Sequence, residues 1–99
     1  MRVISKKTLI AFWQKHPAAE QPLKAWYDEA CKATWETPQQ IKNQYRNASI
    51  VGHNRVVFNI KGNDDRLVVA VAYAMGAWFI QFVGTHTEYD RIDVTTVGQ

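Results

Sequence analysis

The chain has 99 residues, of which 46% are hydrophobic, and its 12 basic and 9 acidic side chains give a formal net charge of +3. This composition fits one folded domain spanning residues 1–99 and excludes a disordered chain, while the small positive charge is compatible with RNA or an acidic protein as partner. A single cysteine, Cys31, excludes an intramolecular disulfide or a cysteine metal cluster and favours a reducing compartment. The sequence has no signal-peptide core near Met1 and no apolar stretch of the roughly 20 residues that cross a bilayer, so we expect a cytoplasmic protein with no membrane partner.

The start of the chain predicts a short strand followed by a helix. Arg2 to Ile4 can form an edge strand, and Ser5 is a reasonable N-cap for a helix from Lys6 to His16. The apolar residues of that segment suit one helical face, and Pro17 ends the helix because proline cannot donate the next backbone hydrogen bond.

Two further helices are predicted in the first half. One begins near Gln21, with Pro22 in its first turn, and carries apolar residues at spacings of three and four. The segment Thr37 to Gln40 has the pattern of a capping box, with Pro38 at N1 and Gln40 at N3, which opens a short third helix that runs through Ile41 to about Tyr45.

After Gly52 the hydrophobic period changes from about 3.6 to 2, which indicates strands. We expect three consecutive strands joined by tight turns, at residues 55–61, 66–74 and 77–83. A second capping box, Thr85 to Glu88, predicts one helical turn that carries Tyr89 and Asp90. A last strand is expected at residues 92–97.

Alternation along the strands assigns a core face to the sheet. If Lys61 faces Arg66 across the first turn, the bulky residues of the first two strands share the face that the helices cover: Val56, Phe58, Ile60, Leu67, Val69 and Val71. A two-residue turn at Met75–Gly76 would add Trp78, Ile80 and Phe82 to that face.

The opposite face is then shallow and open, because it carries the small residues Ala70 and Ala72. Lys61, Arg66 and the start of the His86 segment are expected to meet at one end of this face.

A histidine and two cations at one end of a sheet suit a phosphodiester substrate. RNA is cut without a metal when a base activates its 2′-hydroxyl, an acid protonates the leaving oxygen, and cations stabilise the charge on the phosphorane. His86 can act as base or acid, Lys61 and Arg66 can hold phosphate, and Tyr89 can donate a proton or stack on a nucleobase.

These residues also have structural interpretations. His86 can be a hydrogen-bonding residue at a strand end, and Tyr89 a half-buried edge of the core. Lys61 and Arg66 can be solvated turn flanks that pair with the neighbouring aspartates.

Other side chains could extend an RNA-binding surface. The candidates are Arg55, Asn59, Lys42 and Arg46, although such charges also form ordinary solvated surfaces. Trp35, beside a predicted helix end, is a candidate for an exposed aromatic on which a base could stack.

No metal site or cofactor is expected, because the three histidines, His16, His53 and His86, do not have the spacing of metal ligands.

Several segments, in order and across the whole chain, resemble the HigB toxins of bacterial type II toxin–antitoxin systems. They are Met1–Ser5, Trp13–Pro17, Pro22–Tyr27, Asn54–Asn63, Arg66–Ala70 and Gly84–Asp90. Among them, Phe-Asn-Ile-Lys-Gly-Asn and Gly-Thr-His-Thr-Glu-Tyr-Asp are specific in combination.

The resemblance implies a RelE-like α+β fold, with N-terminal helices packed on one face of a small antiparallel sheet. It also implies a metal-independent mRNA interferase that cuts mRNA on translating ribosomes and leaves a 2′,3′-cyclic phosphate and a 5′-hydroxyl. The implied partner is a HigA-type antitoxin with a helix-turn-helix. The motif residues that it carries over are Lys61, Arg66, His86, Tyr89 and Asp90.

Two alternatives to an endoribonuclease stay open. One is a non-catalytic module of the same fold that binds RNA or a protein. The other is a toxin with a protein target, as in the gyrase-poisoning relatives of this fold.

Overall fold

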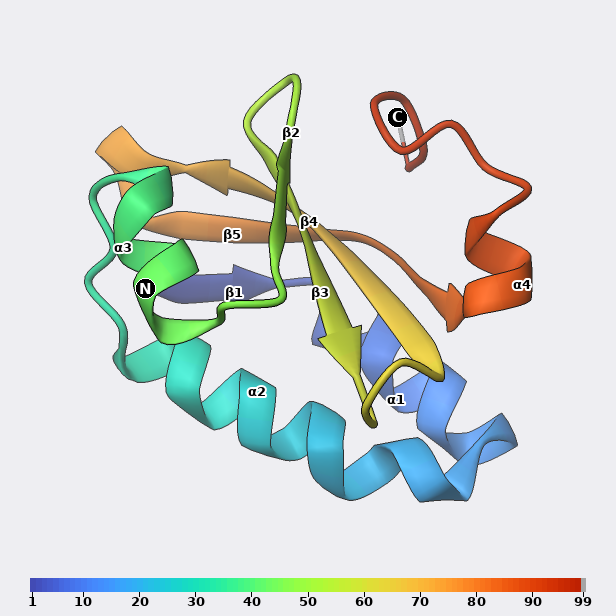
Figure 1. Ribbon diagram of the computed structural model, residues 1–99. Helices are drawn as coiled ribbons and strands as arrows, with labels where there is room; N and C mark the ends of the chain where they lie inside the picture. Colours follow the sequence, from blue (N-terminus) through green and yellow to red (C-terminus); the bar gives the residue numbers. More distant parts are fainter. Residues whose placement is uncertain (99) are drawn as a thin grey trace.

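The computed structural model describes residues 1–98 and has the predicted α+β architecture, with the N-terminal helices packed on one face of a five-stranded sheet (Figure 1). The first half consists of β1 (Arg2–Ile4), α1 (Lys6–Lys15), a 3-10 turn (Pro17–Ala19), α2 (Glu20–Lys32) and α3 (Pro38–Gln44). The second half consists of β2 (Ser49–Val51), β3 (Arg55–Ile60), β4 (Asp65–Ala72), a 3-10 turn (Tyr73–Met75), β5 (Ala77–Thr85) and α4 (His86–Tyr89). None of the helices described is long and apolar enough to span a bilayer.

The predicted helices are confirmed, and the start and end of α1 and the start of α2 lie within a residue of prediction. At the start of α3, the Thr37 side chain accepts a hydrogen bond from the Gln40 amide, as predicted, at 3.4 Å. Gln40 Oε1 in turn accepts from the Glu36 amide at 2.6 Å, one residue before the position that a capping box would use. Ser5 does precede α1, but its φ is 77° and its side chain makes no cap hydrogen bond, so that part of the prediction is wrong.

The strand order is β1-β5-β4-β3-β2, and every neighbouring pair is antiparallel except β1 and β5, which are parallel. The predicted edge strand at the N-terminus is therefore confirmed, and it adds one parallel pair to an otherwise antiparallel sheet. β2 was not predicted; it covers only the beginning of β3. The strand expected at residues 92–97 is wrong, since this segment forms turns.

An aromatic cluster fills the core between the sheet and the helices. Trp78 is fully buried, and its ring lies 4.1 Å from that of Trp35 and 6.0 Å from that of Trp26 in edge-to-face geometry. Trp35 is only 6% exposed, and its indole N–H donates to Gln44 Oε1 at 2.9 Å. The prediction that Trp35 forms an exposed stacking surface is therefore wrong.

The β3–β4 hairpin has the predicted faces but a different register. Val57 lies opposite Val68 instead of Ala70, a shift of two residues, and Ile60 lies opposite Asp65, so the turn comprises residues 61–64. An even shift keeps every side chain on its face, because successive strand residues point to opposite sides. The residues assigned to the core face of β3 and β4 do belong to the core.

A β-bulge changes the end of β5. Val69 pairs with Ile80 but Val68 pairs with Phe82, so Gln81 has no residue directly opposite. Beyond this point the two faces of β5 are exchanged, and Val83 packs against the core. The prediction that Phe82 lies on the core face is therefore wrong.

The second face of the sheet is not open, as had been expected. Val57 and Val68 point to that face and are 3% and 0% exposed, respectively. The segment after α4 returns over this side (Figure 1), and the Arg55 guanidinium donates to the carbonyl oxygens of Val94 and Val97 at 3.0 and 2.6 Å. The C-terminal segment therefore covers part of the face that the helices leave free.

We predict that Trp78→Ala lowers the free energy of unfolding by about 3–5 kcal/mol, since it removes the centre of the aromatic cluster. Urea unfolding followed by fluorescence measures this, with Met75→Ala as the control because Met75 is 72% exposed. Equal effects of the two substitutions would contradict this description of the core.

Candidate active site

The turn of the β3–β4 hairpin and the first residue of α4 meet at one end of the sheet. The backbone N–H of His86 donates to the carbonyl oxygen of Asp64 at 2.9 Å. Lys61, in the same turn, places its ammonium 3.4 Å from Asp64 Oδ2. Asp64 thus lies between Lys61 and His86, two residues predicted to act together.

Arg66 lies near the start of β4, between Asn59 of β3 and Gly84 of β5. Its guanidinium donates through one terminal nitrogen to the carbonyl oxygens of Asn63 and Asp65, at 2.7 and 3.2 Å. The side chain is half-buried and held against the hairpin turn, and its other N–H groups have no hydrogen-bond partner within residues 1–98.

A complete capping box stabilises the start of α4, a helix of only four residues, as predicted. Thr85 Oγ1 accepts from the Glu88 amide at 3.2 Å, and Glu88 Oε1 accepts from the Thr85 amide at 2.8 Å. The bond from the Thr85 amide also lowers the pKa of Glu88, because it stabilises the charged carboxylate. His86 is exposed on this turn, whereas Tyr89 is half-buried.

Gly84 permits the close approach of a ring at the junction of β5 and α4. A Cβ atom at this position would lie 2.5 Å from Cζ of Phe82. Any larger residue would have to displace the Phe82 ring, and its Cβ would also lie 3.1 Å from Glu88 Oε1 of the α4 cap.

The four residues predicted to bind RNA separate into two pairs. Asn59 and Arg46 line the same pocket, beside the hairpin turn. Lys42 is exposed, but its ammonium donates to the carbonyl oxygens of Arg46 and Ala48 at 2.8 and 2.5 Å. Arg55 is 2% exposed and bound to the C-terminal segment, a placement that argues against contact with RNA.

Sequence reasoning missed Asp65, which it treated as part of a turn. Asp65 is the first residue of β4, is 3% exposed, and has no hydrogen-bond partner for Oδ2 among the described residues. Burial raises the pKa of its carboxyl, and the nearby positive charges of Lys61 and His16 oppose this with smaller effects. Only the register of the hairpin reveals this burial.

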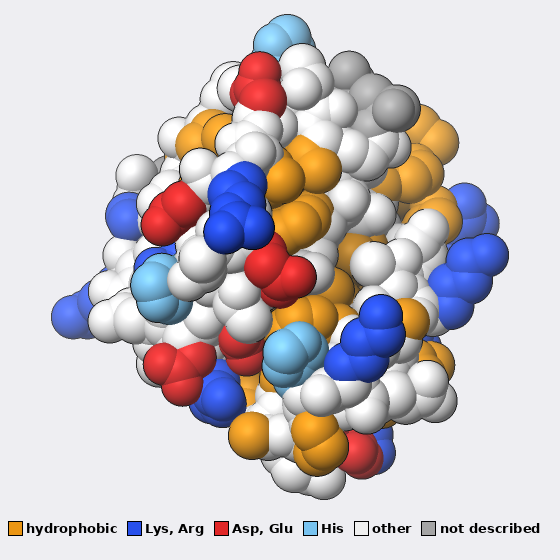
Figure 2. Space-filling view, turned by 90° about the vertical axis from the view of Figure 1, so that its right-hand side faces the viewer, with side chains coloured by type: hydrophobic (Ala, Val, Ile, Leu, Met, Phe, Trp, Pro, Cys, Tyr) orange, Lys and Arg blue, Asp and Glu red, His pale blue; other side chains and the backbone are white. Residues whose placement is uncertain are grey.

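The face of the molecule that carries α4 and the C-terminal segment has acidic, basic and histidine side chains interspersed around a band of hydrophobic ones (Figure 2). Within residues 1–98 no three His, Cys, Asp or Glu side chains are grouped so as to hold a metal ion. The expectation that no metal or cofactor takes part stays a prediction.

Comparison with known proteins identifies the class to which this fold and site belong. The family model for HigB toxin, the RelE-like toxic component of a toxin–antitoxin system, matches residues 19–92. The chain therefore belongs to the HigB family of RelE-like toxins, and the predicted resemblance is confirmed.

Among individual relatives, the chain is similar to the mRNA interferase toxin HigB of Escherichia coli strain K12. The two are 28% identical over 92 residues, which cover 91% of this chain and 88% of the relative. The same values hold for proteins named mRNA interferase HigB from Escherichia coli O157:H7 and Shigella flexneri.

We predict that Asp65→Asn stabilises the protein at pH 7. The folded state raises the carboxyl pKa above its ordinary value of 3.8, so its contribution to stability is greatest below that pH and is lost as pH rises through the folded-state pKa. The gain should therefore shrink between pH 7 and pH 4 in urea unfolding, whereas Asp64→Asn, at an exposed neighbour, should change little at either pH. A loss of stability at both pH values, or a gain independent of pH, would contradict this account.

We predict that Thr85→Ala costs about 1 kcal/mol of unfolding free energy, because it removes the cap of α4. Thr85→Ser keeps a hydroxyl at the same place and should retain most of that stability. The same urea experiment compares the two variants, and an equal loss in both would show that the cap hydroxyl is not responsible.

Proposed function

We propose that the chain is a toxin of a type II toxin–antitoxin system that acts as an mRNA interferase, a metal-independent endoribonuclease that cuts mRNA on translating ribosomes. A HigA-type helix-turn-helix antitoxin neutralises it. The observation that carries the proposal is the hydrogen bond from the His86 amide to Asp64, which brings α4 against the turn that holds Lys61. The relatives are named mRNA interferases, which supports the same activity.

In the proposed reaction the 2′-hydroxyl of the RNA attacks the adjacent phosphorus atom and the bond to the 5′-oxygen breaks. His86 takes the proton from the 2′-hydroxyl or gives one to the leaving oxygen, and its exposure leaves the imidazole accessible to substrate. The products are a 2′,3′-cyclic phosphate and a 5′-hydroxyl.

Lys61 and Arg66 stabilise the extra negative charge of the phosphorane. The ion pair of Lys61 with Asp64 is long and exposed, so it is weak and can be exchanged for a phosphate. Arg66 is held in place by the carbonyls of the turn and offers its remaining N–H donors. Tyr89, half-buried three residues after His86, positions the substrate.

The charges around α4 support dependence on the ribosome. Positive and negative side chains alternate on the face shown in Figure 2, and the net charge of the whole chain is only +3. Tight binding of free RNA depends on many phosphate contacts. A ribosome that presents the mRNA would supply the positioning that this face lacks.

We predict that His86→Ala and Arg66→Ala relieve growth arrest at undiminished protein level and lower mRNA cleavage by about 10² or more. Primer extension on mRNA after induction measures the cuts. Lys32→Ala, at an exposed position on α2, is the control and should cut as the unmodified protein does.

Full toxicity of both variants would contradict the site. Growth arrest by the unmodified protein without any cut in mRNA would contradict the endoribonuclease. Retained RNA binding would then favour a non-catalytic module, and inhibited gyrase a protein target.

A further inference from the structure

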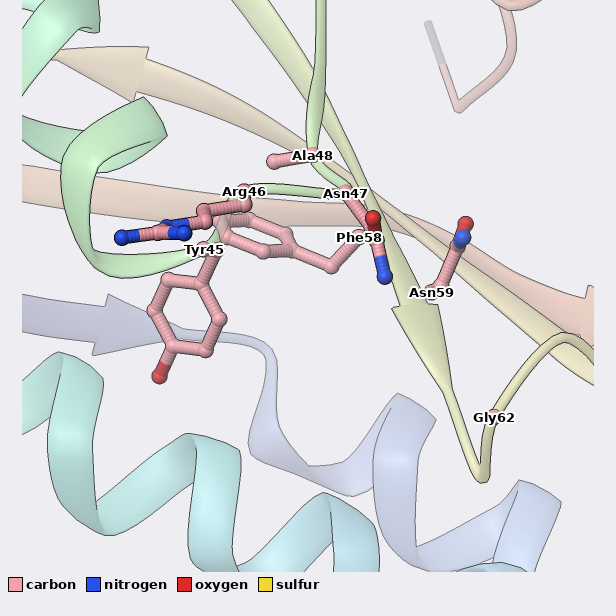
Figure 3. Close-up of a pocket in the computed structure, with 7 residues that line it drawn as sticks. All are labelled: Tyr45, Arg46, Asn47, Ala48, Phe58, Asn59 and Gly62. Atoms are coloured by element: carbon pink, nitrogen blue, oxygen red, sulfur yellow. The ribbon is translucent and has the colours of Figure 1, made fainter.

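A pocket of about 330 Å³ lies beside the candidate active site and has no role in the chemistry proposed above. One wall is the loop of residues 45–48, and the other is formed by Phe58 and Asn59 of β3 with Gly62 of the hairpin turn (Figure 3). Its volume is at the lower end of the roughly 300–1,000 Å³ that small-ligand pockets occupy.

The pocket exists because β2 is short. β2 pairs only with Arg55 to Val57, so the outer edge of β3 has no strand beside it from Phe58 onward. The loop 45–48 passes this edge and is fixed by Lys42, which donates to two of its carbonyl oxygens, and by the bond from the Ala48 amide to Tyr45 O at 3.0 Å. The wall is therefore held in shape without a ligand.

The residues that line the pocket include two aromatic side chains, Tyr45 and Phe58, and two asparagines, Asn47 and Asn59. The rings of Tyr45 and Phe58 lie 5.1 Å apart, edge to face, and Phe58 is only 1% exposed. Asn47 projects its amide from the loop toward β3, while the Arg46 side chain extends away along the rim (Figure 3). Asn59 donates its amide N–H to Asn63 Oδ1 at 3.1 Å, and its side chain points away from Asn47 (Figure 3).

This set of groups matches the edge of a nucleobase. A planar amide offers a donor and an acceptor side by side, as the Watson–Crick edge of a base requires, and unpaired RNA is recognised through such contacts with bases turned out of their stack. A guanidinium at the rim suits the phosphate that accompanies the base.

The pocket is also joined to the candidate active site. Gly62 follows Lys61 directly, and the Asn59–Asn63 bond connects the pocket wall to the turn whose carbonyl holds Arg66. A nucleotide in a chain has a phosphate on each side, so a nucleotide whose base lies in the pocket would have one phosphate near Lys61 and the other toward Arg46.

Resting on the proposed function, we propose that this pocket binds one unpaired nucleobase of the mRNA next to the phosphate to be cut. Asn47 reads its edge, and the pocket gives the toxin a base preference at the cleavage site. Asn47, which the sequence alone did not single out, is the residue on which this specificity most directly depends.

The test is a double-mutant cycle on binding, which combines removal of one RNA base with the Asn47→Ala substitution and does not require cleavage. Ribosomes are programmed with short mRNA oligonucleotides whose 2′-O-methyl groups prevent attack of the 2′-hydroxyl, each with and without one base removed. Binding of the fluorescently labelled toxin to these ribosomes is titrated by anisotropy. Loss of one particular base should weaken binding to the unmodified protein about tenfold, as expected for a base that stacks and hydrogen-bonds. For Asn47→Ala the same loss should cost less than about twofold, because the pocket contact is already gone.

Asn43→Ala is the matched control, since Asn43 is an exposed asparagine of α3 outside the pocket, and it should keep the tenfold effect. Arg46→Gln is a second test and should weaken binding of intact and base-free oligonucleotides alike, as loss of a phosphate contact does. Unfolding midpoints establish that each variant is folded.

Three results would overturn the proposal. They are an equal cost of base removal in the unmodified protein and in Asn47→Ala, equal binding of intact and base-free oligonucleotides, and protection of residues 45–48 by the antitoxin but not by RNA. If the unmodified protein fails to cut mRNA, the proposed function fails while the binding cycle still decides the pocket. If it cuts mRNA but the cost of base removal is the same with and without Asn47→Ala, only the proposed role of the pocket is refuted.

Discussion

The burial of β4 on both faces is the constraint on which the rest of the structure depends. Leu67, Val68 and Val69 are three consecutive residues that point to alternate sides, and all three have no exposed surface. Helices cover one side, and the C-terminal segment bound by Arg55 covers part of the other. With β3 and β5 paired along its two edges, β4 cannot shift, and its first residues fix the position of the hairpin turn against α4.

This constraint explains why the candidate site can be built from so few residues. The turn 61–64 and the single turn of α4 would each be too short to keep a shape alone. They are held by neighbouring positions of the sheet, since Asp65 pairs with Thr85, the residue that caps α4. Lys61, Arg66 and His86 therefore lie at one end of the sheet whose backbone is fixed by strand pairing, which fits their proposed contact with a phosphate in a defined geometry.

Local signals in the sequence predicted most of the elements, and long-range pairing decided the rest. Capping patterns at Thr37 and Thr85 located two helices, and period-2 alternation assigned the faces of β3 and β4 correctly even though the register was wrong by two residues. The bulge that moves Phe82 off the core face has no local sequence signal, because it depends on how β5 fits a strand already paired on its other side. The short β2 was missed for the same reason.

The roles of charged and polar residues were harder to predict than their positions. Arg55 and Lys42 look like phosphate ligands in the sequence, but in the structure each holds backbone carbonyls and shapes the protein. Asp65 looks like a turn residue and is buried. The partners of Arg55 are distant in the chain, the burial of Asp65 is set by the register, and the partners of Lys42 depend on the path of the loop after α3. The residue type alone is therefore not informative.

The chemical ends of the cut RNA test the central claim most directly, because they report how the phosphodiester was broken. Fragments made by the purified toxin on programmed ribosomes, with chelator added after the mRNA is bound, should carry a 5′-hydroxyl that polynucleotide kinase labels without prior dephosphorylation. The upstream fragments should end in a 2′,3′-cyclic phosphate. Fragments with a 5′-phosphate, or cutting that stops when free divalent ions are removed from ribosomes that stay intact, would contradict an acid–base mechanism at His86, Lys61 and Arg66.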